Sequence, residues 1–181
     1  MCWGRRPTAL GVCLAAALLT ATCMGDGDST SEPREADDRA RYGGRSMRID
    51  RVIDGDTAVL EDGTSVRYIG IDAPESRPTP QCGAEAATRA NEAWVESEVV
   101  TIRLDPAETR DRFGRLLAYL ETDRGLVNVA LVRQGFACAF PFGSTRLHRE
   151  EIAAAERAAK EAGSGVWGSC PPIPDGCPPA R

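Results

Sequence analysis

The sequence predicts an α+β fold, a closed barrel of five short strands with about three helices packed against it. Three observations support this prediction. Short apolar segments separated by turn residues begin at Met47, which is typical of a small β unit. One segment of helical character interrupts the strands, and two more follow the last strand. Strands followed by helices favour a small barrel such as an OB-fold.

Five segments have the apolar content and the turn boundaries of strands, at residues 48–53, 57–60, 64–71, 99–104 and 116–121. Asp62-Gly63 predicts a tight hairpin turn before the third segment. On an ideal strand the side chains of Arg67 and Asp72 would face opposite sides, because their separation is odd. Gly70 lies between them and predicts a kink or bulge that brings both side chains to one side.

Three segments have the composition or the spacing of helices, at residues 84–97, 127–134 and 145–162. The first and the last are rich in alanine, which has the highest helix propensity. The second is apolar at helical spacing and stops at Gly135, a residue type that commonly ends helices. The proline-rich stretch DAPESRPTPQCG and the tail after Gly168 are expected to be loops.

Four regions follow from this pattern: a signal peptide (1–23), a disordered linker (24–46), the folded domain (47–170) and a proline-rich tail (171–181). The signal peptide has two arginines before an apolar run that is shorter than the roughly 20 residues of a membrane-spanning helix. The linker has too few apolar residues to offset its chain entropy. We expect a secreted or cell-envelope protein. Ordinary cleavage and release is the preferred interpretation. The alternative is lipidation at the candidate residue Cys23, which would be the only expected membrane anchor.

Four cysteines follow the signal region: Cys82, Cys138, Cys170 and Cys177. An even set of cysteines in an exported domain predicts two disulfides, and the sequence alone allows three pairings. The alternative is a zinc site. It is disfavoured because no C-x-x-C pair is present and His148 is the only histidine.

The charge balance argues against a nucleic-acid partner. The chain has 22 Lys and Arg against 27 Asp and Glu, a net charge of −5, whereas polyanions usually bind basic surfaces. Local charge can override this balance, and a bound divalent cation would add to it. Five arginines are expected near the candidate site: Arg67, Arg77, Arg110, Arg112 and Arg115.

Carboxylates and arginines gather in three segments. These are IDGDT at 53–57, RYIGIDAPE at 67–75 and RDRFGR at 110–115. Carboxylates without histidine or thiolate ligands favour a hard cation such as Ca²⁺. Asp56 and Asp72 are natural ligands at strand ends, and Pro74 favours an extended Ala73 whose carbonyl could face the same ion. Glu75 follows them, placed to hold and deprotonate a water molecule.

Arg67 and Arg115 each offer a planar pair of N–H donors for phosphate oxygens. A metal, a base and two guanidiniums together meet the needs of phosphodiester hydrolysis, which must activate water and stabilise negative charge on phosphorus. Each part alone has a simpler interpretation. Asp54-Gly55 is commonly just a turn, the DAPE segment could cap a helix, and Arg115 could be a solvated residue after a turn.

The combined segments resemble the staphylococcal (micrococcal) nuclease family, also called thermonuclease-like. The resemblance covers about residues 47–170. It rests on VIDGDT at 52–57, RYIGIDAPE at 67–75, RDRFGRLLAYL at 110–120, VNVALVRQGFA at 127–137 and GVWGSC at 165–170. It implies an OB-fold and Ca²⁺-dependent cleavage of single-stranded DNA and RNA to products with 3′-phosphates. We expect a monomer whose partners are DNA and RNA.

The resemblance also implies the roles of individual residues. The expected calcium ligands and the residue that supports them are Asp56, Asp72, the Ala73 carbonyl and Asp54. The expected catalytic residues are Arg67, Glu75 as general base, and Arg115. The expected nucleic-acid-binding residues are Arg112, Phe113, Phe140 and Phe142. The family has tyrosines where these phenylalanines stand, so base stacking is kept while a hydroxyl is lost.

The resemblance further suggests how the cysteines pair. Exported relatives often carry cysteines at the positions of Cys82 and Cys170. This implies a Cys82–Cys170 disulfide and leaves Cys138 for Cys177. Such a bridge would fasten the C-terminal tail to the start of the first helix.

Two other functions are compatible with parts of this pattern. The first is an OB-fold module that binds single-stranded nucleic acid without cutting it. Such a module would be expected to lack some of the acidic and arginine site residues. All five of them are present here, namely Asp56, Arg67, Asp72, Glu75 and Arg115. The second is a cell-surface lipoprotein whose carboxylates bind Ca²⁺ only for stability, and it leaves Arg67 and Arg115 without a role.

Overall fold

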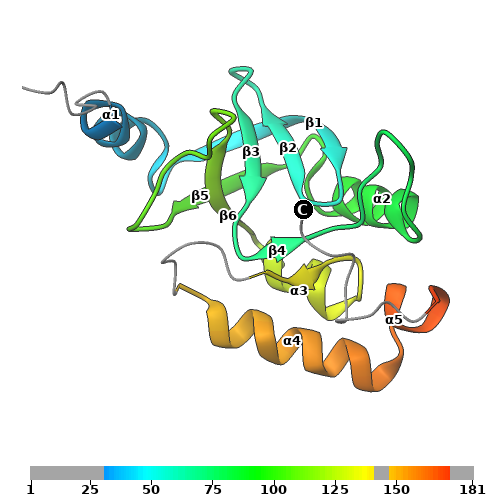
Figure 1. Cartoon of the computed structure of the whole chain (residues 1–181). Helices are drawn as coiled ribbons and strands as arrows, with labels where there is room; N and C mark the ends of the chain where they lie inside the picture. The colour runs from blue at the N-terminus through cyan, green and yellow to red at the C-terminus, as the bar shows by residue number, and fades with distance from the viewer. Residues whose placement is uncertain (1–30, 141–146, 172–181) are drawn as a thin grey trace, which may run out of the picture.

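A sheet that curls into a barrel forms the centre of the molecule (Figure 1). The computed structural model describes residues 31–140 and 147–171, with the backbone alone for residues 31–33. The strands of the barrel are β1 (Ser46–Asp54), β2 (Thr57–Leu60), β3 (Ser65–Tyr68), β5 (Val99–Leu104) and β6 (Leu116–Thr122). They match the five predicted strands to within a few residues.

The sheet closes on itself through one parallel pair. The strand order is β3-β2-β1-β5-β6, and β3 also pairs with β6 in parallel, with Val66 opposite Leu116. The other neighbours are antiparallel. The predicted five-stranded barrel is therefore confirmed. β7 (Gly125–Leu126) extends the end of β6, and β4 (Ile71–Asp72) pairs separately with β8 (Cys138–Ala139).

The core fills the barrel and continues under the helices. All five residues from Leu116 to Leu120 in β6 are buried, because one face of this strand lines the barrel while α3 packs against it from outside. The largest fully buried side chains include Tyr68 and Tyr119. Burial on both faces gives this strand a continuous apolar run in place of the alternation of a half-exposed strand.

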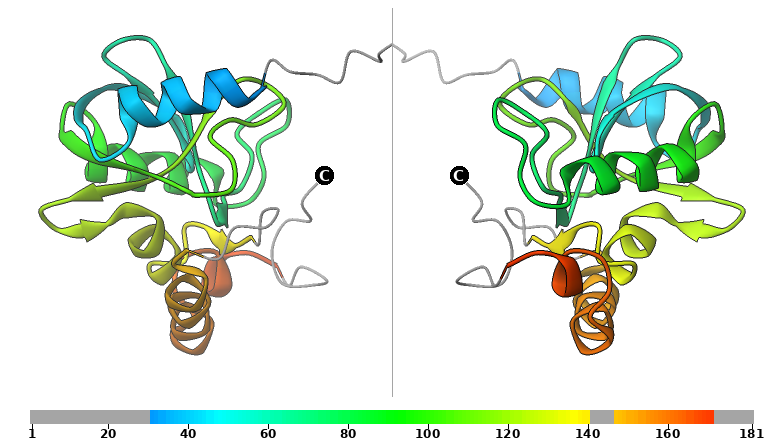
Figure 2. Two further views of the ribbon diagram at one scale, coloured as in Figure 1. Left: turned by 90° about the vertical axis from the view of Figure 1, so that its left-hand side faces the viewer. Right: turned by 90° about the vertical axis from the view of Figure 1, so that its right-hand side faces the viewer.

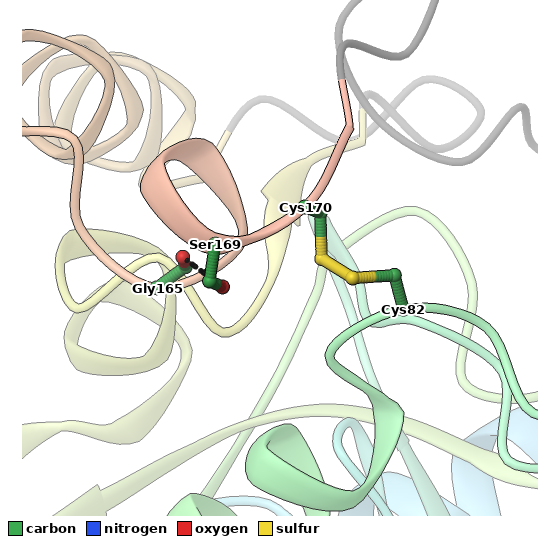
Figure 3. Close-up of a disulfide and its surroundings, with 4 residues drawn as sticks. All are labelled: Cys82, Gly165, Ser169 and Cys170. Atoms are coloured by element: carbon green, nitrogen blue, oxygen red, sulfur yellow. Dashed lines mark hydrogen bonds between the residues drawn. A yellow bond between two sulfur atoms is a disulfide. The ribbon is translucent and has the colours of Figure 1, made fainter.

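Three helices occupy the predicted places: α2 (Ala84–Val95), α3 (Val127–Arg133) and α4 (Arg149–Ala162). α4 packs along α3 below the barrel, and α2 lies beside β1 (Figure 1). A short helix that was not predicted, α5 (Val166–Ser169), follows α4. The disulfide Cys82–Cys170, with its Cα atoms 5.8 Å apart, ties the end of α5 to the start of α2 (Figure 3). The predicted pairing of these two cysteines is confirmed.

The linker predicted at residues 24–46 is wrong for its second half. Residues Ser31–Tyr42 form helix α1, which lies against the barrel (Figure 2). Its anchors are Tyr42, which is 2% exposed, and Asp38, which is 4% exposed. Low apolar content predicted disorder. One buried aromatic ring and one buried carboxylate, both bonded to distant parts of the chain, supply the contacts that a count of apolar residues misses.

Several predictions fall outside the described residues, namely the signal peptide at 1–23, Cys23, Phe142, Cys177 and most of the tail. Cys138 is disulfide-bonded, whereas its expected partner Cys177 is among these residues. In the described part of the chain, no helix has both the length and the apolar character needed to cross a membrane.

Candidate active site

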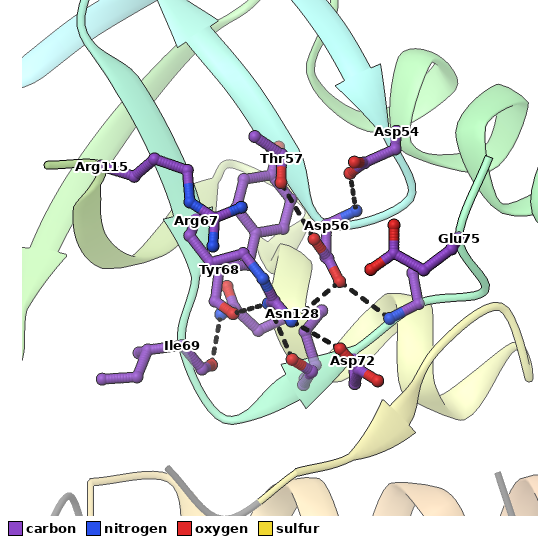
Figure 4. A network of polar contacts seen from close by, with 12 residues as sticks. Asp54, Asp56, Thr57, Arg67, Tyr68, Ile69, Asp72, Glu75, Arg115 and Asn128 are labelled. Carbon is purple, nitrogen blue, oxygen red and sulfur yellow. Dashed lines mark hydrogen bonds and ion pairs between the residues drawn. The ribbon is translucent and has the colours of Figure 1, made fainter. Parts of the chain in front are cut away.

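A cleft of about 290 Å³ opens where the turn between β1 and β2, the strands β3 and β4, and the loop before β6 meet. The structure brings most of the predicted site residues together along this cleft (Figure 4). Those that line it are Asp54, Asp56, Arg67, Asp72, Glu75, Arg112, Phe113, Arg115 and Phe140. Segments separated by up to about half the chain therefore converge on one polar cavity.

The turn between β1 and β2 presents two of the carboxylates. Asp54 Oδ1 accepts a hydrogen bond of 3.1 Å from the Asp56 backbone N–H, a local contact that favours aspartate in tight turns. Gly55 between them lies so close to its neighbours that an added Cβ would be 2.6 Å from Ala73 Cβ and 2.8 Å from Ala87 Cβ. A side chain at this position would push the turn away from the segment that carries Asp72.

Helix α2 also holds the turn between β1 and β2. Asn91 is fully buried, and its Nδ2 donates to the Asp54 carbonyl at 2.8 Å. Its Oδ1 accepts a hydrogen bond of 2.9 Å from the Tyr68 hydroxyl. Because a buried amide is costly to leave unpaired, this residue fixes the position of β1, β3 and α2 relative to one another at the edge of the cleft.

Arg67 lies at the centre of the acidic cluster. Its Nη2 is 3.1 Å from Asp56 Oδ2 and 2.7 Å from Asp72 Oδ1, so one nitrogen contacts both carboxylates (Figure 4). Its Nη1 donates to the carbonyls of Tyr68 at 2.6 Å and Ile71 at 2.8 Å. These four contacts hold the guanidinium in one orientation.

A break after β3 makes these contacts possible. Gly70 has a φ of +83°, a conformation that residues with a Cβ rarely adopt, and it separates β3 from β4. The predicted kink at Gly70 is confirmed. An added Cβ would also lie 2.8 Å from Ile152 Cδ1 of α4. Asn128 Nδ2 of α3 donates to the Ile69 carbonyl at 2.9 Å, which secures the backbone directly before the bend.

Burial and mutual repulsion make the two central carboxylates unusually basic. Burial raises the pKa of Asp56 from 3.8 to about 7, and the charges of Asp54 and Asp72 add to this rise while Arg67 opposes it. The pKa of Asp72 is also raised, chiefly by burial, with Arg67 opposing and the charge of Glu75 adding. A single guanidinium therefore compensates this cluster incompletely, and a further positive charge would stabilise it.

The donor chemistry fits a hard cation. Asp56 Oδ2 and Asp72 Oδ1 converge on a single cationic nitrogen, which shows that the two carboxylates can share one positive charge. Within residues 31–140 and 147–171, no group of three or more His, Cys, Asp or Glu side chains could hold a metal ion. Further ligands would have to be backbone or water oxygens, as oxygen-binding cations accept. The Ala73 backbone N–H donates to Asp56 Oδ2 at 2.8 Å and orients it.

Glu75 comes from the loop that follows β4, and its side chain extends toward Asp54 and Asp56 (Figure 4). The loop is closed by Gln81. The Glu75 backbone N–H donates to Gln81 Oε1 at 2.8 Å, and the Gln81 backbone N–H donates to the Glu75 carbonyl at 2.9 Å. The next residue, Cys82, carries the disulfide. The exposed Glu75 carboxylate is therefore carried by a residue whose backbone N–H and C=O are both hydrogen-bonded to Gln81.

Arg115 is held by a turn just before β6. Its Nε donates to Asp111 Oδ2 at 2.7 Å, and Asp111 Oδ1 accepts from the backbone N–H groups of Phe113 at 2.9 Å and Arg115 at 3.0 Å. The Phe113 ring is 69% exposed. The guanidinium carbons of Arg112 and Arg115 lie 4.7 Å and 5.5 Å from its centre, a range in which a cation is attracted to an aromatic face.

Two of the five arginines expected near the site are not among the residues that line the cleft. Arg77 is exposed on the loop after Glu75. Arg110 turns to α1, where its Nη2 is 2.7 Å from Asp38 Oδ1. This ion pair raises the pKa of Arg110 and withdraws its charge from the cleft. The local positive charge predicted from the sequence is therefore smaller than expected.

Several supporting residues were not predicted. Asn91 and Asn128 each lie inside a helix and bond a carbonyl beside the cleft. Buried asparagine in a helix is uncommon, so a lone asparagine on the apolar face of each predicted helix was the available signal. Asp111 belongs to a motif segment and Gln81 to the proline-rich loop, but spacing alone does not show that they hold Arg115 and Glu75.

Comparison with known proteins agrees with this geometry. The family model for staphylococcal nuclease homologues matches residues 65–169. The thermonuclease of Staphylococcus intermedius is 34% identical over 130 residues, which cover 68% of this chain and 77% of that protein. Endonuclease YncB of Bacillus subtilis (strain 168) is 31% identical over 129 residues, or 67% of this chain and 61% of that protein. The SPbeta prophage-derived endonuclease YokF of the same organism is 32% identical over 128 residues.

The Bacillus proteins are longer than the matched region, since the chain spans 61% of the first and 43% of the second. The match to the family nonetheless includes the strand that carries Arg67, the loop that carries Glu75 and the turn that carries Arg115. On the matched region and the arrangement of the cleft, this chain belongs to the staphylococcal nuclease homologue family.

Proposed function

We propose that this protein is a nuclease that hydrolyses phosphodiester bonds in single-stranded DNA and RNA, with Ca²⁺ as its metal ion and 3′-phosphate products. The observation that carries the proposal is the convergence of Asp56 and Asp72 on one cationic nitrogen of Arg67, in a cleft that Glu75 and Arg115 also line. Family members named thermonuclease and endonuclease support the same reaction class.

Asp56 and Asp72, with the Ala73 carbonyl, would hold the ion, and Asp54 would orient Asp56 through its backbone. When bound, Ca²⁺ supplies positive charge for the phosphoryl oxygens. The same two carboxylate oxygens now contact Arg67 Nη2. Arg67 is therefore placed beside the site that would hold the ion, where its guanidinium would donate to a phosphate oxygen of the substrate.

Glu75 is the proposed general base. Its carboxylate removes a proton from a water molecule in the cleft, and the water oxygen then forms a bond to phosphorus. The bond from phosphorus to the 5′-oxygen breaks and this oxygen takes up a proton from solvent water, which leaves a 3′-phosphate and a 5′-hydroxyl. Arg67 and Arg115 donate N–H groups to the phosphoryl oxygens as negative charge grows on them.

The rim of the cleft suits an unpaired strand. Phe113 and Phe140 line it, and the exposed Phe113 ring can stack on a base, which requires bases that are not paired in a duplex. Phe142 is proposed to act with them. Arg112 beside Phe113 offers a charge for the phosphate backbone. These residues would bind the substrate and leave the chemistry to the residues deeper in the cleft.

We also propose that the protein acts outside the cell, either released or attached through lipid on Cys23. The signal peptide predicted at residues 1–23 supports export. The Cys82–Cys170 disulfide supports it independently, because structural disulfides form and persist in oxidising compartments.

The test uses the protein with its disulfides oxidised, single-stranded DNA or RNA as substrate, and Ca²⁺ or a chelator. Three proteins are compared: the natural chain, Glu75→Gln and, as a matched control, the exposed Glu96→Gln. We expect Ca²⁺-dependent products with 3′-phosphate ends from the natural chain and the control, and a large loss with Glu75→Gln. Binding without cleavage under any divalent metal would instead favour a non-catalytic binding module.

A further inference from the structure

Helix α1 lies before the part of the chain that matches the family, yet it bonds directly to the segment that carries Arg115. Asp38 is 4% exposed and faces this segment. Its two carboxylate oxygens accept hydrogen bonds of 2.7 Å each from Arg110 Nε and Nη2. Oδ2 accepts a third from the Thr109 hydroxyl at 3.1 Å. Asp38 thus binds two consecutive residues of the segment.

The contacts continue from Arg110 to Arg115. Arg110 Nη1 donates to the carbonyl of Gly114 at 2.8 Å, directly before Arg115. The Asp111 backbone N–H donates to the Arg115 carbonyl at 3.0 Å, and the Asp111 carboxylate binds the Arg115 guanidinium. Hydrogen bonds from both Arg110 and Asp111 therefore hold the turn that precedes β6 and carries Arg115.

A second residue of α1 fastens the start of the same segment. Arg39 Nη1 and Nη2 donate to the carbonyls of Asp105 and Pro106, both at 2.9 Å. The Tyr42 ring lies beneath Arg110, with the guanidinium carbon 6.0 Å from the ring centre. Figure 2 shows α1 (blue) lying across the barrel close to this loop. The helix therefore contacts residues 105–106 and 109–110 of this segment directly, and Arg110 carries the contact on to Gly114.

We propose that Asp38 is a positioning residue for Arg115, acting through Arg110 and Gly114, so that α1 is part of the catalytic apparatus although it touches no substrate. This inference rests on the proposed nuclease function. A buried, bidentate ion pair fixes direction as well as distance. Removal of the Asp38 carboxylate charge leaves Arg110 without its ion-pair partner. The turn that carries Arg115 is then no longer held to α1 through Arg110.

The first test compares Asp38→Asn with Asp37→Asn, which removes the same charge from an exposed position on the same helix. We expect Asp38→Asn to lower kcat by about 10- to 100-fold, since small misplacements of a catalytic group have effects of this order. We expect KM to change less, and calcium affinity measured by calorimetry to stay as in the natural chain. Asp37→Asn should match the natural chain throughout.

A double-mutant cycle separates positioning from a general structural effect. In a background of Arg115→Ala, Asp38→Asn should have little further effect on kcat, because the group that it positions is absent. An equal loss of kcat in both backgrounds, or an unchanged kcat in Asp38→Asn, would overturn the proposal. If Asp38→Asn does not fold, Asp38→Asn with Arg110→Met removes both charges and leaves no buried ion unpaired; it should show the same loss of kcat.

Amide hydrogen exchange gives a readout that does not depend on activity. The backbone N–H groups of Asp111, Gly114 and Arg115 are all bonded within the turn. They should exchange faster in Asp38→Asn than in Asp37→Asn. Unchanged exchange would refute the inference. If the natural chain cleaves no nucleic acid, the proposed function fails, and the exchange rates alone decide whether Asp38 orders the turn.

Discussion

Replacement of Asp56 by asparagine tests the electrostatics of the cleft. Burial raises the pKa of this carboxyl from 3.8 to about 7 in the folded protein, whereas in the unfolded chain it keeps its ordinary value. Between these two pH values the folded state therefore binds more protons than the unfolded state. Stability then falls as pH rises, so the metal-free protein should be less stable near pH 7 than near pH 5.

The size of the effect follows from the two pKa values. Near pH 5 the folded state holds almost the whole proton and the unfolded state almost none, and near pH 7 the folded state holds about half. Integration of this difference gives a loss of about 2 kcal/mol in the free energy of unfolding from pH 5 to pH 7. Asp56→Asn cannot titrate at this position, so the loss should be absent from the variant.

The assay is urea unfolding of both proteins in a chelator at several pH values from about 5 to 8. The free energy of unfolding of the natural chain minus that of Asp56→Asn should decrease by about 2–3 kcal/mol over this range. Subtraction cancels carboxyls remote from Asp56, such as Asp62, whose pKa is lowered, against the opposing effect of burial, by its hydrogen bonds to Thr64 and Tyr42 and by Arg41. A difference that stays constant or grows with pH would refute the reasoning.

Two further changes test the loop that carries Glu75. Removal of the Cys82–Cys170 disulfide by alanine at both positions should lower the free energy of unfolding by about 2–4 kcal/mol, because the bridge joins residues 88 apart in sequence; urea unfolding measures this, and an unchanged midpoint would contradict it. Gln81→Ala should lower kcat severalfold and leave calcium affinity unchanged, because it frees the Glu75 amide. Kinetics measures kcat and calorimetry measures calcium affinity. A lower calcium affinity with an unchanged kcat would contradict the prediction.

The strands of the barrel were predictable because their signals are local. Asp62-Gly63 and Gly70 mark bends by residue type alone, and the apolar segments between such marks had only a few ways to pair. Helix α1 was not predictable in this way. Its buried carboxylate, Asp38, is bonded to Arg110, 72 residues further along the chain, and no local pattern records a partner at that distance.

The candidate site shows the same difference between features with local signals and features that depend on distant parts of the chain. The motifs identified the residues of the cleft, but they assigned Arg67 to the substrate phosphate alone. In the structure Arg67 contacts Asp56 and Asp72 at once, a juxtaposition that depends on closure of the barrel and on the bend at Gly70. Sequence spacing establishes which residues are available, whereas the charges that they meet are set by strands that pair across the fold.

The charge of the cleft resolves the apparent conflict between an acidic protein and a polyanionic substrate. Five carboxylates line the cleft against three arginines, a balance of about −2 when all are ionised. A fourth arginine that could have helped, Arg110, is paired with Asp38 instead. A single divalent cation would bring this balance to about zero. Metal and nucleic acid should therefore bind cooperatively, because the ion removes the repulsion that a phosphate would otherwise meet. Substrate affinity that is independent of Ca²⁺ would show that phosphate contacts lie outside this cleft.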